Sequence, residues 1–114
     1  MNRYPTLAAR LEANSVAVSC GCRLWLGRVN NDGYPVFTQR VNGKPVPQYA
    51  HRASWSIANN QPVPAGMHVD HLCVDTRCIA EAHLEVVTPA VNQARKVQRR
   101  KAAQRRADAA ATRH

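Results

Sequence analysis

The stretch HVDHLCVDTRCIAEAHLEVVTPAVNQAR, residues 68–95, decides the fold of this 114-residue chain. Within it, Cys73, Cys78 and His83 follow one another with four residues in each interval, so three soft metal ligands fall within eleven residues. Such a cluster is too dense for a random scatter of four cysteines and five histidines. Zinc in structural sites is tetrahedral and takes a fourth ligand. We therefore predict a structural zinc site.

The fourth zinc ligand has to come from outside this stretch, and Cys22, or less favourably Cys20, can supply it from the other end of the domain. The first residues, MNRYPTLAARLEANS, lack the apolar segment of an export signal. Cysteines in a chain without such a signal are better suited to metal than to disulfides. A body with two tryptophans and one phenylalanine needs a metal to hold it together. The alternative interpretation is buried free thiols and a surface histidine.

The residues around the cysteines predict a strand, a loop and a helix in that order. MHVDH, residues 67–71, is typical of a short strand, and residues 73–87 form a compact loop that ends in a short apolar element. Thr88 and Pro89 indicate the start of a helix, with threonine as the N-cap and proline in the first turn. We expect this strand, loop and helix to be braced by the zinc ion.

The predicted C-terminal helix has apolar residues only near its start. Val91, Ala94 and Val97 give it a stripe that can pack against the body. No large apolar residue follows, so we expect the later part to be frayed or ordered by a partner. Residues 1–94 carry eight bases and six acids, a net charge of +2, whereas residues 95–114 carry eight bases and one acid, a net charge of +7.

This distribution predicts a domain over residues 1–94 and a basic helical or disordered tail over residues 95–114. A nearly balanced body with a strongly basic tail suggests a polyanionic partner, most often nucleic acid. A solvated tail that binds nothing is the alternative. No run of eighteen apolar residues is present, so we expect no membrane partner and a cytoplasmic protein.

The N-terminal half predicts two helices separated by a hairpin. Residues 6–14 and 49–59 have apolar residues at helical spacing. Between them, residues 34–49 contain two β-prone runs around Asn42-Gly43, the strongest hairpin signal in the chain, and prolines confine the runs to edge strands. A polar ribbon of this kind fits a DNA groove, although exposed polar hairpins are common in proteins that bind nothing. Its candidate DNA-binding residues are Gln39, Arg40, Lys44 and Gln48.

Asp70 and His71 end the predicted strand, outside the zinc set. A histidine here is a further ligand, a satisfied polar residue or a general base. Asn92 on the following helix favours the last interpretation, because a carboxamide oxygen is a hard ligand suited to magnesium. We expect the strand, the zinc-braced loop and the helix to bring Asn92 beside His71.

Residues 68–95 resemble the ββα-metal (His-Me finger) nuclease motif, in the form shared by His-Cys box homing endonucleases and small phage HNH endonucleases. The resemblance covers about residues 6 to 96 and implies a small zinc-braced α+β fold. The other matching segments are CRLWLG (22–27), NNDGYPVF (30–37), AHR (50–52) and PVPAGMHVDH (62–71).

The resemblance implies a metal-dependent endonuclease that hydrolyses phosphodiester bonds in double-stranded DNA and leaves 5′-phosphate and 3′-hydroxyl ends. His71 would be the general base, Asn92 would hold the catalytic Mg²⁺, and Asp70 would be a weaker second magnesium ligand. The implied structural zinc ligands are Cys22, Cys73, Cys78 and His83. Cleavage of both strands implies a homodimer, and a phage-encoded protein would work in the host cytoplasm.

One segment departs from the family pattern, because family members read C-V-N-P-x-H-L where residues 78–84 read CIAEAHL. The missing Asn-Pro predicts an altered loop and reduced activity. A zinc-containing DNA-binding module that is catalytically weak or inactive is therefore the alternative function. A basic structural protein of a nucleoprotein particle is a further one, but it leaves His71 and Asn92 unexplained.

The remaining polar candidates are expected to contact DNA through its phosphates. Arg52 follows the family's AHR pattern, and the others lie on the C-terminal helix: Arg95, Lys96, Arg99 and Arg100. Trp25 and Trp55 are interpreted as core residues, His68 as a surface residue and His114 as uninformative.

Overall fold

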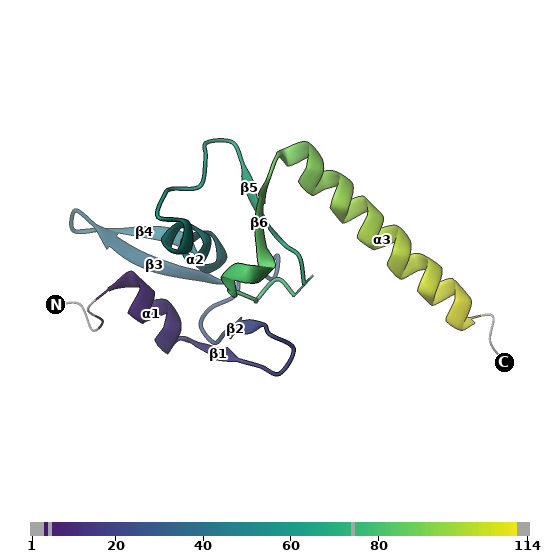
Figure 1. The fold of residues 1–114 in the computed structure, drawn as a ribbon, viewed down its shortest axis with the longest axis horizontal. Helices are drawn as coiled ribbons and strands as arrows, with labels where there is room; N and C mark the ends of the chain where they lie inside the picture. Colours follow the sequence, from purple (N-terminus) through teal and green to yellow (C-terminus); the bar gives the residue numbers. More distant parts are fainter. Residues whose placement is uncertain (1–3, 5, 74, 112–114) are drawn as a thin grey trace.

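The computed structural model describes residues 4, 6–73 and 75–111, so His114 lies outside the described residues. Strands pair into three separate two-stranded antiparallel ribbons, β1 with β2, β3 with β4 and β5 with β6. Helices and ribbons together confirm the predicted α+β class (Figure 1). The elements are α1 (Leu7–Ala13), β1 (Ser15–Ala17), β2 (Arg23–Trp25), β3 (Val36–Val41), β4 (Lys44–Tyr49), α2 (Ala50–Asn59), β5 (His68–His71), the 3-10 turn η1 (Glu81–His83), β6 (Leu84–Val87) and α3 (Pro89–Ala111).

The predicted hairpin is the ribbon β3–β4. Its turn residues, Asn42 and Gly43, have φ values of 52° and 76°, the left-handed conformation that a tight hairpin turn requires. Residues paired across an antiparallel ribbon point to the same face, and successive residues along one strand point to opposite faces. By this register, Arg40 lies on the face opposite Phe37. The other three candidates lie on the Phe37 face: Gln39, Lys44 and Gln48. The four candidate DNA-binding residues therefore do not all lie on one face of the ribbon.

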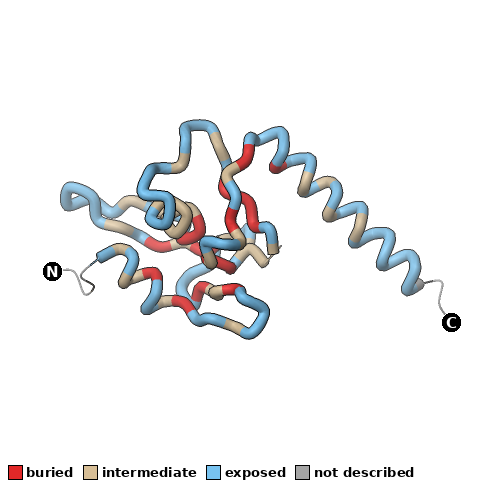
Figure 2. The backbone as a smooth tube through the Cα atoms, in the orientation of Figure 1, coloured by how far each residue is buried: buried red, intermediate tan, exposed pale blue. Residues whose placement is uncertain are grey.

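The apolar core is small, as the composition predicts. Trp25 is its largest member, and its indole nitrogen donates to the Arg28 carbonyl at 3.1 Å. A side chain at Gly27 would come within 3 Å of that indole, so glycine is required there. Trp55 is only half-buried. One cluster of buried apolar residues contains Leu11, Trp25, Phe37, Ala50 and Ile79, and Val69, Leu84 and Val87 are buried outside it. Figure 2 shows that the buried parts of the tube are few, whereas the tip of the β3–β4 hairpin and most of α3 are exposed.

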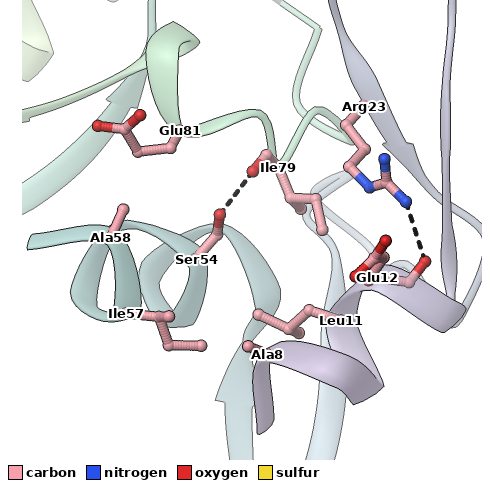
Figure 3. A pocket seen from close by; sticks show the side chains of 9 residues that line it. All are labelled: Ala8, Leu11, Glu12, Arg23, Ser54, Ile57, Ala58, Ile79 and Glu81. Atoms are coloured by element: carbon pink, nitrogen blue, oxygen red, sulfur yellow. Dashed lines mark hydrogen bonds between the residues drawn. The ribbon is translucent and has the colours of Figure 1, made fainter. Parts of the chain in front are cut away.

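Backbone hydrogen bonds hold the segment before η1 against β2. The Trp25 amide donates to the Arg77 carbonyl at 2.9 Å, and the Ile79 amide donates to the Arg23 carbonyl at 2.7 Å. From the other side, the Ser54 hydroxyl of α2 donates to the Ile79 carbonyl at 2.6 Å (Figure 3). These contacts bring Cys22, just before β2, to the cysteines of the loop.

Helix α3 begins where the sequence predicts, with the Thr88 hydroxyl accepting from the Val91 amide at 3.2 Å. It continues to Ala111 and passes through residue 94 without a break. The predicted apolar stripe is wrong, because Val91 and Ala94 are exposed and polar side chains of α3 face the body instead.

Beyond its first three turns, α3 extends away from the body, and the molecule measures 60 × 30 × 24 Å (Figure 1). From residue 100 to residue 110 every side chain is exposed except the half-buried Ala102. Within the described ranges, no helix has the length and apolar character needed to cross a bilayer.

Candidate metal centre and active site

Four soft ligands converge in the body of the fold. Their ligand atoms all lie within 4.8 Å of one another, and they belong to Cys22, Cys73, Cys78 and His83. Nδ1 of His83 lies 3.5 Å from Sγ of Cys22 and 3.6 Å from Sγ of Cys78. A tetrahedral zinc with bonds of about 2.3 Å to sulfur and about 2.0 Å to nitrogen would separate these atoms by about 3.6 Å. The cluster therefore has the chemistry and the spacing of a zinc site.

The structure resolves the choice between two cysteines that the sequence leaves open. Cys22 is buried and faces the cluster, whereas Cys20 is exposed and lies outside it. Burial, together with hydrogen bonds to the neighbouring thiols, raises the pKa of Cys22, and burial also raises the pKa of Cys73. A divalent cation among these sulfurs would reverse that effect by stabilising the thiolates. The donor set therefore fits zinc.

His71, the predicted general base, is 3% exposed and is held by the zinc loop. Its Nε2 lies 3.0 Å from the carbonyl oxygen of Cys78. Because a carbonyl only accepts, Nε2 carries the proton and Nδ1 keeps a free lone pair. Burial lowers the pKa of His71, despite opposing contributions from the Cys78 carbonyl and the Asp70 charge. His71 is therefore a neutral base at physiological pH.

A second imidazole lies against the first. The ring centroid of His51 on α2 is 4.7 Å from that of His71, and Tyr34 stacks on His51 at 5.5 Å. Burial is the largest cause that lowers the pKa of His51 to about 3, followed by the charge that His71 carries when protonated and by the charge of Arg52. Nδ1 of His51 is buried without a hydrogen-bond partner among the described residues. His51 therefore remains neutral and supplies a polar but uncharged wall beside His71.

Asn92, the predicted magnesium ligand, is 9% exposed and lies in the first turn of α3. Its Nδ2 is 2.8 Å from Nδ1 of His68, the first residue of β5. Both side chains line a hollow of about 280 Å³ between α2, β5 and α3. Other polar residues on its wall are Tyr34, His51, Arg52 and Lys96. His68 is exposed, as expected from the sequence, and it also lines this hollow.

Asp70 faces α3 and is 5% exposed. Arg95 donates to its Oδ2 at 2.9 Å, and Arg99 donates to its two oxygens at 3.1 Å each. Arg99 also donates to the main-chain oxygen of His71 at 3.0 Å. Burial opposes the charge, but the hydrogen bonds from Arg99 and Arg95 outweigh it and lower the pKa of the Asp70 carboxyl.

The structure relates His71 and Asn92 only indirectly, through His51. In the described part of the chain no hydrogen bond joins the two side chains, and the alternation of β5 places His71 on the face opposite His68. His51 connects them, because it contacts His71 and lines the same hollow as Asn92. His71 itself is not among the residues that line the hollow, so the expectation that Asn92 lies beside His71 stays a prediction.

The predicted DNA-binding residues divide into two groups. Arg52 lines the hollow and donates to the Met67 carbonyl at 3.2 Å, and Lys96 lines the same wall. Arg95 and Arg99 face Asp70, whereas Arg100 on the same helix is exposed. Arginines at 95 and 99 therefore hold α3 on the body, a role that the charge pattern alone does not distinguish from DNA contact.

The sequence model of the HNH endonuclease family matches residues 48–94, the segment that contains α2, β5, three of the four zinc ligands and Asn92. The predicted resemblance to HNH endonucleases is thereby confirmed for this segment. Protein 7.7 of Escherichia phage T7 is 38% identical to the chain over 71 residues, which are 62% of this chain and 51% of the phage protein. The match thus spans about half the length of that relative. No solved structure shows significant similarity to the chain.

Proposed function

We propose that the protein is a metal-dependent endonuclease that hydrolyses phosphodiester bonds in double-stranded DNA. The observation that carries the proposal is the hydrogen bond from Nε2 of His71 to the carbonyl of Cys78. The sulfur of Cys78 belongs to the candidate zinc site, and its carbonyl oxygen accepts the hydrogen bond from His71. The structural metal site would therefore fix the orientation of the imidazole that performs the chemistry.

In this proposal His71 acts as the general base through Nδ1, the nitrogen that the Cys78 carbonyl does not engage. Nδ1 takes a proton from the attacking water, which a neutral imidazole does well near pH 7. Asn92 holds the catalytic Mg²⁺ through its carboxamide oxygen. When bound, Mg²⁺ neutralises the charge that grows on the phosphate and on the departing 3′ oxygen. Arg52 and Lys96 supply positive charge along the same wall for the DNA backbone.

Asp70 is the weaker candidate for a second magnesium ligand. Both of its oxygens accept hydrogen bonds from guanidinium groups, so it would reach a cation only after Arg95 and Arg99 release it. This pairing also favours the alternative function, a zinc-containing DNA-binding module with weak or no cleavage. Phosphates of bound DNA are the natural competitors for the two arginines.

A plasmid-nicking assay tests the proposal. Zinc-loaded protein is incubated with supercoiled plasmid in Mg²⁺, and a parallel sample receives no added divalent ion. We expect conversion of the supercoiled form to nicked or linear DNA only with the divalent ion. Tight DNA binding without conversion in Mg²⁺ or Mn²⁺ would favour the binding module instead.

Adjacent arginines on α3 give a separate prediction. Arg100→Gln removes an exposed charge, so we expect weaker DNA binding and a log-log salt dependence shallower by about 1. Arg99→Gln removes the same charge and also three hydrogen bonds to Asp70 and the His71 carbonyl. We expect it to lower the free energy of unfolding by about 1–2 kcal/mol and to reduce cleavage at saturating DNA. Thermal unfolding measures the loss of stability, and single-turnover rates measure the loss of cleavage. Equal effects of the two substitutions on stability and cleavage would contradict the proposal that Arg99 holds α3 on the body.

The biological setting is proposed from the phage relative and the domain arrangement. We propose that the protein acts in the cytoplasm of a host cell, that residues 95–114 form a basic segment separate in function from residues 1–94, and that a homodimer cuts both strands. Arg100 and the hairpin residues Gln39, Lys44 and Gln48 are proposed DNA contacts. Sedimentation with and without a DNA duplex tests the oligomeric state.

A further inference from the structure

The hydrogen bond between His68 and Asn92 was not predicted and has a consequence for metal binding. The two nitrogens, Nδ1 of His68 and Nδ2 of Asn92, are 2.8 Å apart. The Asn92 side chain makes no other hydrogen bond within the part of the chain that the structure describes. Its orientation therefore depends on one neighbour.

A carboxamide has two different ends, and only one of them binds a cation. The oxygen is a hard ligand, whereas the NH₂ group is a donor that repels a cation. His68 accepts from Nδ2 when its own Nδ1 has no proton and Nε2 carries it. In that tautomer the Asn92 oxygen is left free to face the hollow. If Nδ1 of His68 carried the proton, it would hold the oxygen and turn the NH₂ group towards the cation.

The other polar groups nearby do not provide the same control. Tyr34, Tyr49 and His51 also line the hollow, but in the described part of the chain none of them is hydrogen-bonded to the Asn92 side chain. Arg52 and Lys96 carry only donors, so neither can accept the amide hydrogens of Asn92. The Arg52 guanidinium is moreover engaged by the Met67 carbonyl. Asp70, on the same face of β5 as His68, is occupied by two arginines. His68 is therefore the residue placed to set which end of Asn92 faces the metal.

We propose that His68 is a positioning residue that orients the Asn92 carboxamide with its oxygen towards the hollow, where a divalent cation shared with a DNA phosphate binds. This inference rests on the proposed function, because it needs Asn92 to be the ligand. It assigns no proton transfer to His68. Outer-sphere partners of this kind commonly change metal affinity by about 10- to 100-fold.

The test measures Mn²⁺ binding by electron paramagnetic resonance, using complexes with a DNA duplex and subtracting binding to the duplex alone. All proteins carry His71→Ala so that the duplex stays intact. His68→Leu removes the acceptor, and we expect Mn²⁺ affinity to fall by about 10- to 100-fold. His68→Gln offers an oxygen acceptor in place of the imidazole nitrogen, and we expect it to retain most of the affinity. Zinc content and thermal unfolding confirm that each variant folds.

Asn92→Asp provides the matched control, because a carboxylate presents an oxygen in either orientation and needs no acceptor beside it. We expect His68→Leu to have little effect on Mn²⁺ affinity in the Asn92→Asp background. An equal loss in both backgrounds would overturn the proposal, since His68 would then act as a direct ligand or through the fold. Unchanged Mn²⁺ affinity in His68→Leu alone would overturn it while leaving the proposed function intact. Absence of Mn²⁺ binding by a protein with intact His68 and Asn92 would overturn both.

Discussion

Replacement of His71 by alanine is expected to reduce DNA cleavage by about 10²- to 10⁴-fold, the usual contribution of a general base. The reason is geometric, because the Cys78 carbonyl fixes Nε2 and leaves Nδ1 as the proton acceptor. The alanine variant keeps the zinc ligands and the basic residues of α3. Zinc content and DNA affinity should therefore remain close to those of the unaltered protein, while the rate of plasmid nicking falls.

Leu72→Ala is the matched control for this experiment. Leu72 is the next residue, is 49% exposed and contributes no polar side chain to the site. We expect its cleavage rate to stay within about threefold of the unaltered protein, as for most exposed substitutions. Cleavage retained by His71→Ala, with its zinc and DNA binding intact, would remove His71 from the mechanism.

Loss of one zinc ligand is the second large effect that we expect. Cys22→Ser should abolish stoichiometric zinc binding and unfold the domain, because the main cluster of buried apolar residues is small and contains only Leu11, Trp25, Phe37, Ala50 and Ile79. Zinc in small domains contributes about 10–16 kcal/mol, comparable with the whole folding free energy of a small domain, about 5–15 kcal/mol. Metal analysis and circular dichroism on the same sample measure both consequences.

Cys20→Ser controls for the loss of a thiol. Cys20 lies two residues away but is exposed and outside the cluster. We expect this variant to bind one zinc ion per chain and to fold normally. Zinc retained by Cys22→Ser and lost from Cys20→Ser would show that the ligand set is wrong.

Short-range signals explain why much of the fold could be predicted. The hairpin could be predicted because Asn42 and Gly43 favour a tight turn by themselves. The start of α3 could be predicted because Thr88 and Pro89 are typical capping and first-turn residues of a helix. The zinc set was predicted because three of its members lie within eleven residues. The sequence did not decide whether Cys20 or Cys22 is the fourth ligand, since spacing alone does not show which of two nearby cysteines points into the cluster.

Long-range polar contacts explain the failures. Asp70 and Arg99 are 29 residues apart, and no periodic pattern relates them. The apolar stripe of α3 was expected to pack because apolar periodicity usually marks a buried face. The body instead presents Asp70 and His68 to α3, so polar side chains form the contact. His68 is exposed, as expected from the sequence, but its hydrogen bond to Asn92, 24 residues away, could not be predicted for the same reason.

The most direct test is a crystal structure of the zinc-loaded protein with a DNA duplex and Mn²⁺, using anomalous scattering to locate the manganese. We expect manganese bound to the Asn92 oxygen and to one DNA phosphate, with Nδ1 of His71 facing the phosphorus of that same phosphate. Manganese bound away from Asn92, or a phosphate at Asn92 that His71 does not face, would contradict the proposal that these two residues act on one bond.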